Sequence, residues 1–249
     1  MISRLLIFYI IILIPFFKPD YIAGVGSKLG IIYNALLLIS FFIATYMYLK
    51  CKIKKERMPL ITLMLLYNAI IVIASLINKN CSLYSAVMNF MIMVSLSIII
   101  NFGMINHKRT VLKALLCILN LLITINLVTI FLFPNGMWVS QIGYWENWFL
   151  GYDNNHILIL MPAIIISYIY NKTYYGKMPI NFYFTLLIVN VTVFKTWSAT
   201  SLVGILLLDC IMLFKVDKVK ILQPKKLLLL SVILFIFIVI LRAQNVFSF

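Results

Sequence analysis

The sequence has very little charge and almost no acidic residues. Charged residues make up 11% of its 249 residues, and only six are Asp or Glu, whereas 64% are hydrophobic and the mean hydropathy is +1.10. A soluble domain of this length cannot hide so much apolar surface, because its surface-to-volume ratio leaves too little interior. The composition therefore excludes an ordinary soluble domain and predicts a membrane protein.

Long apolar stretches recur along the whole chain, separated by short polar segments. They lack the period-2 alternation of a membrane β-barrel, and lipid requires a backbone whose polar groups are satisfied internally. We therefore expect one domain over residues 1–249, an all-α polytopic integral membrane bundle of about nine transmembrane helices. The predicted spans are Leu5–Phe17, Leu29–Leu49, Leu60–Ile77, Leu83–Phe102, Val111–Phe133, Ile157–Tyr170, Asn181–Phe194, Ser201–Phe214 and Leu227–Leu241.

The basic residues are divided unequally between the polar segments. With the amino terminus in the cytoplasm, 16 of the 21 Lys and Arg residues fall on inner segments and five on outer ones. Cytoplasmic loops of membrane proteins carry such an excess of Lys and Arg. This pattern predicts a cytoplasmic amino terminus in a multi-pass plasma-membrane protein. The net charge of +15 therefore lies mostly at the inner face of the membrane, where its partner is membrane lipid, and we expect no binding of nucleic acid.

Histidine and cysteine are scarce as well, with two His and four Cys in the chain. His107 is predicted on the inner side and His156 on the outer side, which excludes an ordinary histidine-rich metal cluster. The cysteines are divided among the inner side, the outer side and the membrane, so no disulfide pair is indicated. We expect no metal and no cofactor. The first apolar stretch is followed by no convincing cleavage site, so we expect a retained anchor rather than a signal peptide.

Asparagines fall inside several of the predicted spans, where polar side chains are costly. We expect most of them to form hydrogen bonds between helices. Among them are Asn68, Asn89, Asn120, Asn126 and Asn190.

The longest outer segment, "FPNGMWVSQIGYWENWFLGYDNNH", holds three of the four tryptophans, Trp138, Trp145 and Trp148. Two interpretations are open. The rings form an aromatic belt at the water interface, or they belong to a short re-entrant segment that offers aromatic platforms to a sugar. Glu146 in the same segment is either a solvated loop charge or a general base or hydroxyl-binding group.

The segment ends with Asp153, Asn154, Asn155 and His156, directly before an apolar run. Asp and Asn are preferred helix caps, because their side-chain oxygens accept hydrogen bonds from the free amides of the first turn. Capping does not account for His156, which is a costly residue just inside a membrane helix. Polar groups near the membrane edge that face a bundle interior indicate a functional site.

A second outer stretch, "FKTWSATSLVG", places Lys195, Ser198, Thr200 and Ser201 directly before the eighth span. Hydroxyl capping is again the simplest interpretation. The sixth and eighth spans both run from outside to inside, so their amino-terminal ends, which favour anions, both lie at the outer surface. If the two ends meet, they and Lys195 form a small phosphate site that uses neither a metal nor a glycine-rich loop.

Three stretches, "IPFFKPDYI", "YDNNHILILMPAIIISYIY" and "TWSATSLVGILL", resemble the O-antigen polymerase and ligase family, and more closely a Gram-positive capsular or exopolysaccharide repeat-unit polymerase. The resemblance implies a membrane glycosyltransferase that joins undecaprenyl-diphosphate-linked oligosaccharide repeats at the outer face. It implies no nucleotide sugar and no metal, and flippase and chain-length regulator proteins as partners. The residues that match the two outer motifs are Asp153, Asn154, Asn155 and His156 in the first and Trp197, Ser198, Thr200 and Ser201 in the second.

As a working hypothesis, the outer ends of the sixth and eighth helices and Lys195 hold the donor diphosphate. His156, Asp153 or Glu146 accepts the proton of the acceptor sugar hydroxyl. The further residues assigned to substrate binding are Trp145 and Arg242.

The family pattern continues through further helices and a second outer loop rich in arginine, whereas this sequence stops at "RAQNVFSF", with Arg242 its only outer arginine. We therefore expect a polymerase truncated at its carboxyl end, inactive if the loop is essential. The alternatives are a transporter or flippase for lipid-linked oligosaccharide and an inactive, truncated membrane protein that serves as a scaffold.

Overall fold

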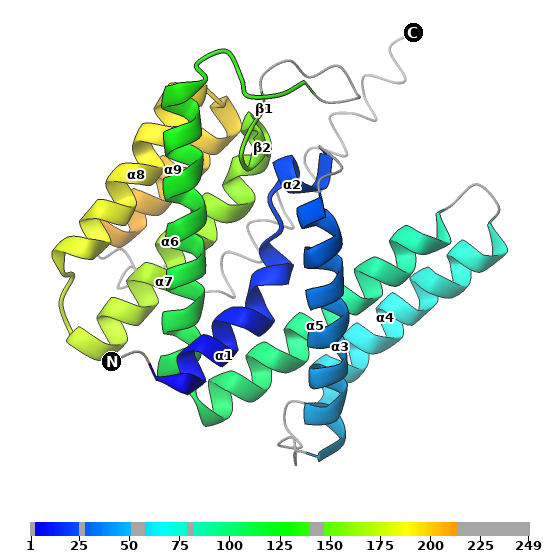
Figure 1. Ribbon diagram of the computed structural model, residues 1–249. Helices are drawn as coiled ribbons and strands as arrows, with labels where there is room; N and C mark the ends of the chain where they lie inside the picture. The colour runs from blue at the N-terminus through cyan, green and yellow to red at the C-terminus, as the bar shows by residue number, and fades with distance from the viewer. Residues whose placement is uncertain (1–2, 25–27, 51–57, 79–81, 140–146, 214–249) are drawn as a thin grey trace, which may run out of the picture. The chain divides into compact units, whose positions relative to one another are not determined.

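The computed structural model describes residues 3–24, 28–50, 58–78, 82–139 and 147–213, and it is mostly helical (Figure 1). Two antiparallel strands of two residues each form the only sheet in this part of the chain. The elements are α1 (Arg4–Leu13), η1 (Ile14–Phe17), α2 (Asp20–Gly24), α3 (Lys28–Lys50), α4 (Met58–Ile77), α5 (Leu83–Asn106), α6 (Lys108–Leu132), β1 (Asn147–Trp148), β2 (Gly151–Tyr152), η3 (Asp153–His156), α7 (Ile157–Tyr175), α8 (Ile180–Thr196) and α9 (Ala199–Leu213).

The first eight apolar stretches predicted from the sequence all form helices, and Leu227–Leu241 lies outside the described residues. Four helical segments among the described residues are long and apolar enough to cross a membrane: Lys28–Lys50, Leu83–Asn106, Lys108–Leu132 and Asp153–Tyr175. Four further apolar helices are shorter. The structure therefore fits a helical membrane bundle, while nine crossings and a cytoplasmic amino terminus stay predictions.

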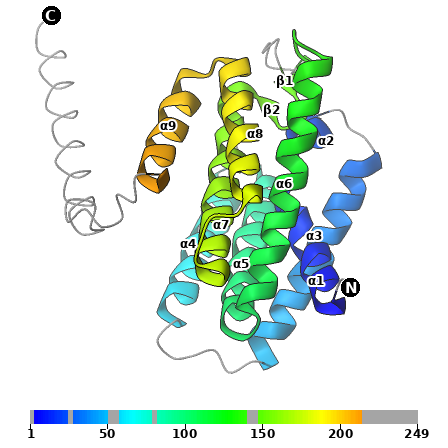
Figure 2. The same cartoon turned by 90° about the vertical axis from the view of Figure 1, so that its left-hand side faces the viewer.

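The chain divides into two compact units, Met1–Leu202 and Val203–Phe249. In the first unit, α6 is the central helix and packs against α1, α5, α7 and α8. Helices α7 and α8 also pack against each other, and α5 packs against α3 and α4 (Figures 1 and 2). In the second unit the described residues form the greater part of α9.

The sequence of α6 explains its central position. Its buried residues recur at intervals of three and four along the whole helix, from Val111 and Leu115 to Ile130, so one broad stripe is covered by its neighbours. The opposite side carries exposed apolar residues such as Leu121 and Val128, as expected of a helix that faces lipid.

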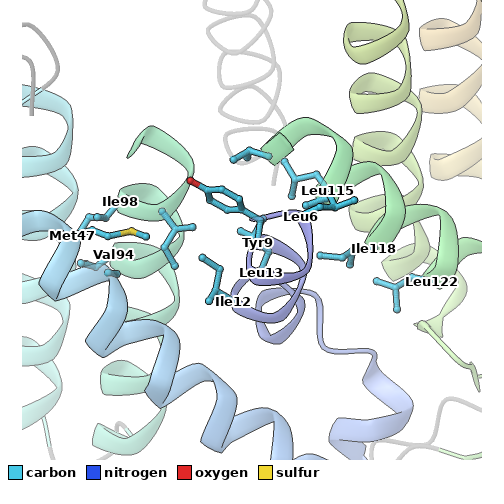
Figure 3. Close-up of a cluster of buried hydrophobic side chains, with 14 of the residues drawn as sticks. Leu6, Tyr9, Ile12, Leu13, Met47, Val94, Ile98, Leu115, Ile118 and Leu122 are labelled. Atoms are coloured by element: carbon cyan, nitrogen blue, oxygen red, sulfur yellow. The ribbon is translucent and has the colours of Figure 1, made fainter. Parts of the chain in front are cut away.

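The main core lies around α1. Tyr9 and Leu13 are 1% and 0% exposed, and α1 lies between Val94 and Ile98 of α5 on one side and Leu115 of α6 on the other (Figure 3). Helices α5 and α6 approach closely at Gly103, where a Cβ atom would contact Val111 and Tyr9. The packing of the core around α1 therefore requires a residue without a side chain at position 103, in addition to apolar residues elsewhere.

Leu13→Ala should lower the stability of the purified protein, whereas Ile11→Ala should change it little. Leu13 is fully buried, and truncation of a buried leucine leaves a cavity that costs about 2–5 kcal/mol. Ile11 lies on the same helix but is 48% exposed. Thermal unfolding in detergent measures both variants, and equal losses would contradict the packing of α1.

Candidate functional site

A short hairpin forms the foundation of the candidate site. Asn147 pairs with Tyr152 and Trp148 with Gly151, so that Phe149 and Leu150 form a two-residue turn. Such a turn leaves amides that lack ladder partners, and buried amides must be hydrogen-bonded. Two residues of α6 supply the acceptors.

Asn126 and Thr129 of α6 hold the turn. The Leu150 amide donates to Asn126 Oδ1 at 2.9 Å, and the Phe149 amide donates to Thr129 Oγ1 at 3.4 Å. Asn126 is fully buried. The expectation that intramembrane asparagines bond between helices holds for Asn120, whose Oδ1 accepts from Thr185 of α8, but Asn126 instead positions a hairpin.

Trp138 and Trp148 both take part in packing. Trp148 is 2% exposed, and its Nε1 donates to the carbonyl of Phe133 at 2.8 Å. Trp138 donates from Nε1 to the carbonyl of Trp148 at 2.9 Å. A buried Trp148 offers no open face to a sugar, so the sugar-platform interpretation is wrong for this residue, while the aromatic belt stays a prediction. Trp145 and Glu146 lie outside the described residues.

The "DNNH" stretch forms the short helix η3, which leads directly into α7. No side chain caps the start of either helix, so the predicted N-cap of α7 is not observed. Asp153 Oδ1 instead accepts from the neighbouring Asn154 amide at 2.7 Å. The side chains of Asn154 and Asn155 bind groups on distant segments.

Asn155 and Asn154 each bind a different part of the chain. Asn155 Nδ2 donates to Asp20 Oδ2 at 3.0 Å, and Asp20 begins α2. Asn154 Oδ1 accepts from Ser198 Oγ at 2.6 Å, and Ser198 directly precedes α9. The three stretches noted in the sequence, around residues 20, 154 and 198, therefore meet in one place within the first unit.

His156 lies beneath this meeting point and is 1% exposed. Its Nε2 lies 3.1 Å from the carbonyl oxygen of Gly151. Because a carbonyl only accepts hydrogen bonds, Nε2 carries the proton and donates it. Nδ1 has no hydrogen-bond partner among the described residues. The ring centroid lies 5.8 Å from that of Trp148. In this structure the imidazole holds the hairpin against η3 and is not open to solvent.

The second motif forms the junction between α8 and α9. Trp197 ends α8 in the left-handed conformation with φ 53°, the only non-glycine residue with positive φ in the described part of the chain. Ser198 Oγ accepts from the Ser201 amide at 3.4 Å, which confirms the predicted hydroxyl capping of α9. Ser201 Oγ lies 3.0 Å from Ser198 Oγ, so the two hydroxyls and Asn154 form a chain of hydrogen bonds.

Several predicted binding residues lie on the exposed side of this cluster. Asn154 and Asn155 are exposed, Asp153 is half-buried, and Trp197 is 76% exposed. Lys195 is also exposed, and its Nζ lies 5.6 Å from the ring centroid of Phe131 at the end of α6. The side chain of Thr200 and the whole of Arg242 lie outside the description.

Sequence reasoning missed two residues that shape the site. Gly151 has φ 105°, and a Cβ atom there would collide with the carboxylate of Asp20. Asp20 lies in the stretch "IPFFKPDYI", for which the sequence predicts only the family resemblance and no role for this carboxylate. The glycine between Trp148 and the "DNNH" motif was the available signal for a tight backbone approach.

The described residues contain no group of three or more His, Cys, Asp and Glu side chains that could hold a metal ion. Comparison of the chain with protein-family models, with curated proteins and with solved structures finds no match.

Gly151→Ala should destabilise the protein more than Gly176→Ala. Both glycines have positive φ, which costs an alanine about 1–2 kcal/mol. Only at Gly151 does the added methyl also meet Asp20, whereas nothing lies within 4 Å of a Cβ at Gly176. Melting temperatures of the two variants in detergent measure the difference, and equal values would contradict the contact between Asp20 and the hairpin.

Proposed function

We propose that the chain is a membrane glycosyltransferase of the polysaccharide-polymerase type. It joins oligosaccharide repeat units carried on undecaprenyl diphosphate into a capsular polysaccharide or exopolysaccharide. One observation carries the proposal: Asp20, Asn154 and Ser198, which belong to the three stretches that resemble such polymerases, are linked by hydrogen bonds through the "DNNH" segment. The separation of 44 residues between Asn154 and Ser198 makes this a tertiary arrangement and not a local turn.

Asp153 is the best placed of the three candidate bases. Its carboxylate is half-buried, and its only hydrogen bond within the described residues comes to Oδ1 from the Asn154 amide. Oδ2 is therefore left to accept a proton. His156 has a buried ring and a proton already committed to Gly151, so we assign it to positioning. Glu146 lies outside the described residues and stays an alternative.

The proposed reaction is a displacement at the anomeric carbon of the donor sugar. Asp153 accepts the proton of the acceptor hydroxyl as its oxygen forms the new glycosidic bond. The bond between the anomeric carbon and the diphosphate oxygen breaks, and the lipid diphosphate leaves with its electron pair. Lys195, exposed beside the junction of α8 and α9, is suited to stabilise the negative charge that grows on this leaving group.

Trp197 is suited to bind a sugar ring. Its indole is 76% exposed, and its backbone is held in a conformation that costs a non-glycine residue about 1–2 kcal/mol. Residues in such unfavourable backbone conformations cluster at ligand-binding sites, and they persist only where the surrounding structure holds them in place. The apolar face of an indole stacks on the C–H face of a sugar while its N–H remains free to donate.

We further propose that the site faces the outside of the plasma membrane, with the amino terminus in the cytoplasm and about nine crossings in all. The distribution of Lys and Arg supports this orientation, because the excess falls on segments of the opposite side. Repeat units flipped to the outer face would then reach Asp153 and Trp197 directly, which implies a flippase and a chain-length regulator as partners.

In cells that depend on this protein for polymer, Asp153→Asn should lower the amount of polymer by at least about 100-fold, the contribution of a general base. Single lipid-linked repeat units should accumulate at the outer face. Ser75→Ala is the matched control, because Ser75 is on α4 and its hydroxyl bonds only to its own helix at Ile71. Electrophoresis of extracted polysaccharide and mass spectrometry of lipid-linked repeats provide the measurements.

Normal polymer from Asp153→Asn, with the protein present at its usual level, would remove Asp153 from the mechanism. Loss of lipid-linked repeats from the outer leaflet, rather than their accumulation, would indicate a transporter and contradict the proposed reaction.

A further inference from the structure

A cavity of about 500 Å³, lined by both apolar and polar side chains, lies between α6, α7 and the start of α8. Its lining residues Tyr175 and Pro179 place it where α7 ends and α8 begins. The hairpin β1–β2 lies at the opposite end of α7 (Figure 1). The residues that line it are Lys113, Leu116, Cys117, Asn120, Ser167, Tyr170, Asn171, Tyr175, Pro179 and Asn181.

Part of the cavity lining is polar, although the helices that form it are largely apolar. Ser167 and Asn171 of α7 are 1% and 4% exposed, and Asn171 Nδ2 donates to the carbonyl and hydroxyl oxygens of Ser167 at 2.8 and 3.3 Å. Polar side chains in membrane helices are costly, and they usually face a bundle interior or a water-filled cavity. Asn120 of α6 is a further polar residue of the lining.

The charge of the cavity has one sign. Among the described residues that line it, Lys113 is the only charged one, and none is an Asp or Glu. Arg109, one helical turn before Lys113, lies close to the hydroxyls of Tyr170 and Tyr175, both of which line the cavity. Its Cζ also lies 5.3 Å from the ring centroid of Tyr174. Two cations without a neighbouring carboxylate, together with hydroxyl and amide donors, are suited to an anion with several oxygens, such as phosphate.

The depth of the cavity favours a lipid over a free ion. Lys113 is near the start of α6, and Asn120 lies seven residues further on, about 10 Å along the helix axis. The lining therefore continues from the charged end of the bundle into apolar levels, where Leu116 and Cys117 form the wall. A headgroup phosphate near Lys113 would leave the apolar part of the lipid beside these residues. Basic pockets between transmembrane helices on the cytoplasmic side bind anionic headgroups in this way.

We propose that this cavity binds the phosphate of an anionic membrane lipid, with Lys113 as its main charge partner and Arg109 at its rim. The side-chain amide of Asn120, whose Oδ1 accepts from Thr185, supplies a neutral donor from Nδ2 below the phosphate. The inference is independent of the proposed polymerase reaction, because none of its residues belongs to the site at the hairpin.

Cys117 provides a built-in reporter, because its thiol is exposed in the wall of the cavity. In a full-length chain carrying Cys51→Ser, Cys81→Ser and Cys210→Ser, Cys117 is the only thiol. The rate of its modification by N-ethylmaleimide is measured in detergent with added phosphatidylglycerol, phosphatidylcholine or inorganic phosphate, and read by mass spectrometry. Phosphatidylglycerol should slow the modification several-fold, and phosphatidylcholine should have little effect.

Charge variants assign the effect to the cavity. Lys113→Gln should raise the concentration of phosphatidylglycerol needed for protection by about five-fold, the contribution of one Lys near an anionic lipid. Lys113→Arg should keep the protection. Lys177→Gln is the matched control, because Lys177 is an exposed lysine of the α7–α8 connection that does not line the cavity.

Equal protection by the two lipids, or protection unchanged in Lys113→Gln, would overturn the proposal. Inorganic phosphate that protects at a lower concentration than phosphatidylglycerol would overturn its assignment to a lipid. The amount of polymer made by cells with Lys113→Gln does not bear on the lipid site, which is tested by the protection of Cys117. The polymerase proposal is tested separately, by Asp153→Asn.

Discussion

A hairpin placed against an apolar helix bundle must have its turn amides hydrogen-bonded, and the candidate site depends on how this chain meets that requirement. Asn126, fully buried on α6, accepts from the Leu150 amide, and Thr129 one turn later accepts from Phe149. An unpaired buried amide costs about 1–3 kcal/mol. These two bonds therefore determine where the hairpin can lie, and they do so from the most deeply packed helix of the first unit.

The remaining contacts of the site follow from the position of the hairpin. The carbonyl of Gly151 is the acceptor for His156, and the missing Cβ of Gly151 gives Asp20 room to approach and bind Asn155. With η3 held in this way, Asn154 meets Ser198 at the start of α9. Polar residues that would be costly singly are thus satisfied by one another, while Asp153 and Trp197 remain open on the exposed side.

The helical part of the fold could be predicted from the sequence, because each apolar stretch is long and its flanks are polar. The meeting of the "DNNH" and "TWSATS" stretches was also within reach, since two helices with the same direction place their first turns at the same end. Capping of α9 by Ser198 is also confirmed, because a cap depends only on residues that are neighbours in the sequence.

The features of the site that could not be predicted depend on tertiary contacts. A histidine next to two asparagines gives no indication that its ring will be buried under a hairpin, and the sequence does not distinguish a buried Trp148 from an exposed one. Asn126 is one of several asparagines in the predicted spans, and nothing in its neighbours marks it as the acceptor for a turn 24 residues away. The cavity beside Lys113 was missed because its polar residues are dispersed over three helices, one or two to a turn.

The central claim is that the two motifs meet at the outer surface of the cell. The most direct measurement is disulfide formation between Asn154→Cys and Ser198→Cys in a chain without its native cysteines, with the cells intact and the reagents unable to cross the membrane. The account predicts rapid cross-linking that is blocked by prior treatment with an impermeant maleimide. Cross-linking that is absent, or a cysteine pair that reacts with the maleimide only after the cells are opened, would contradict it.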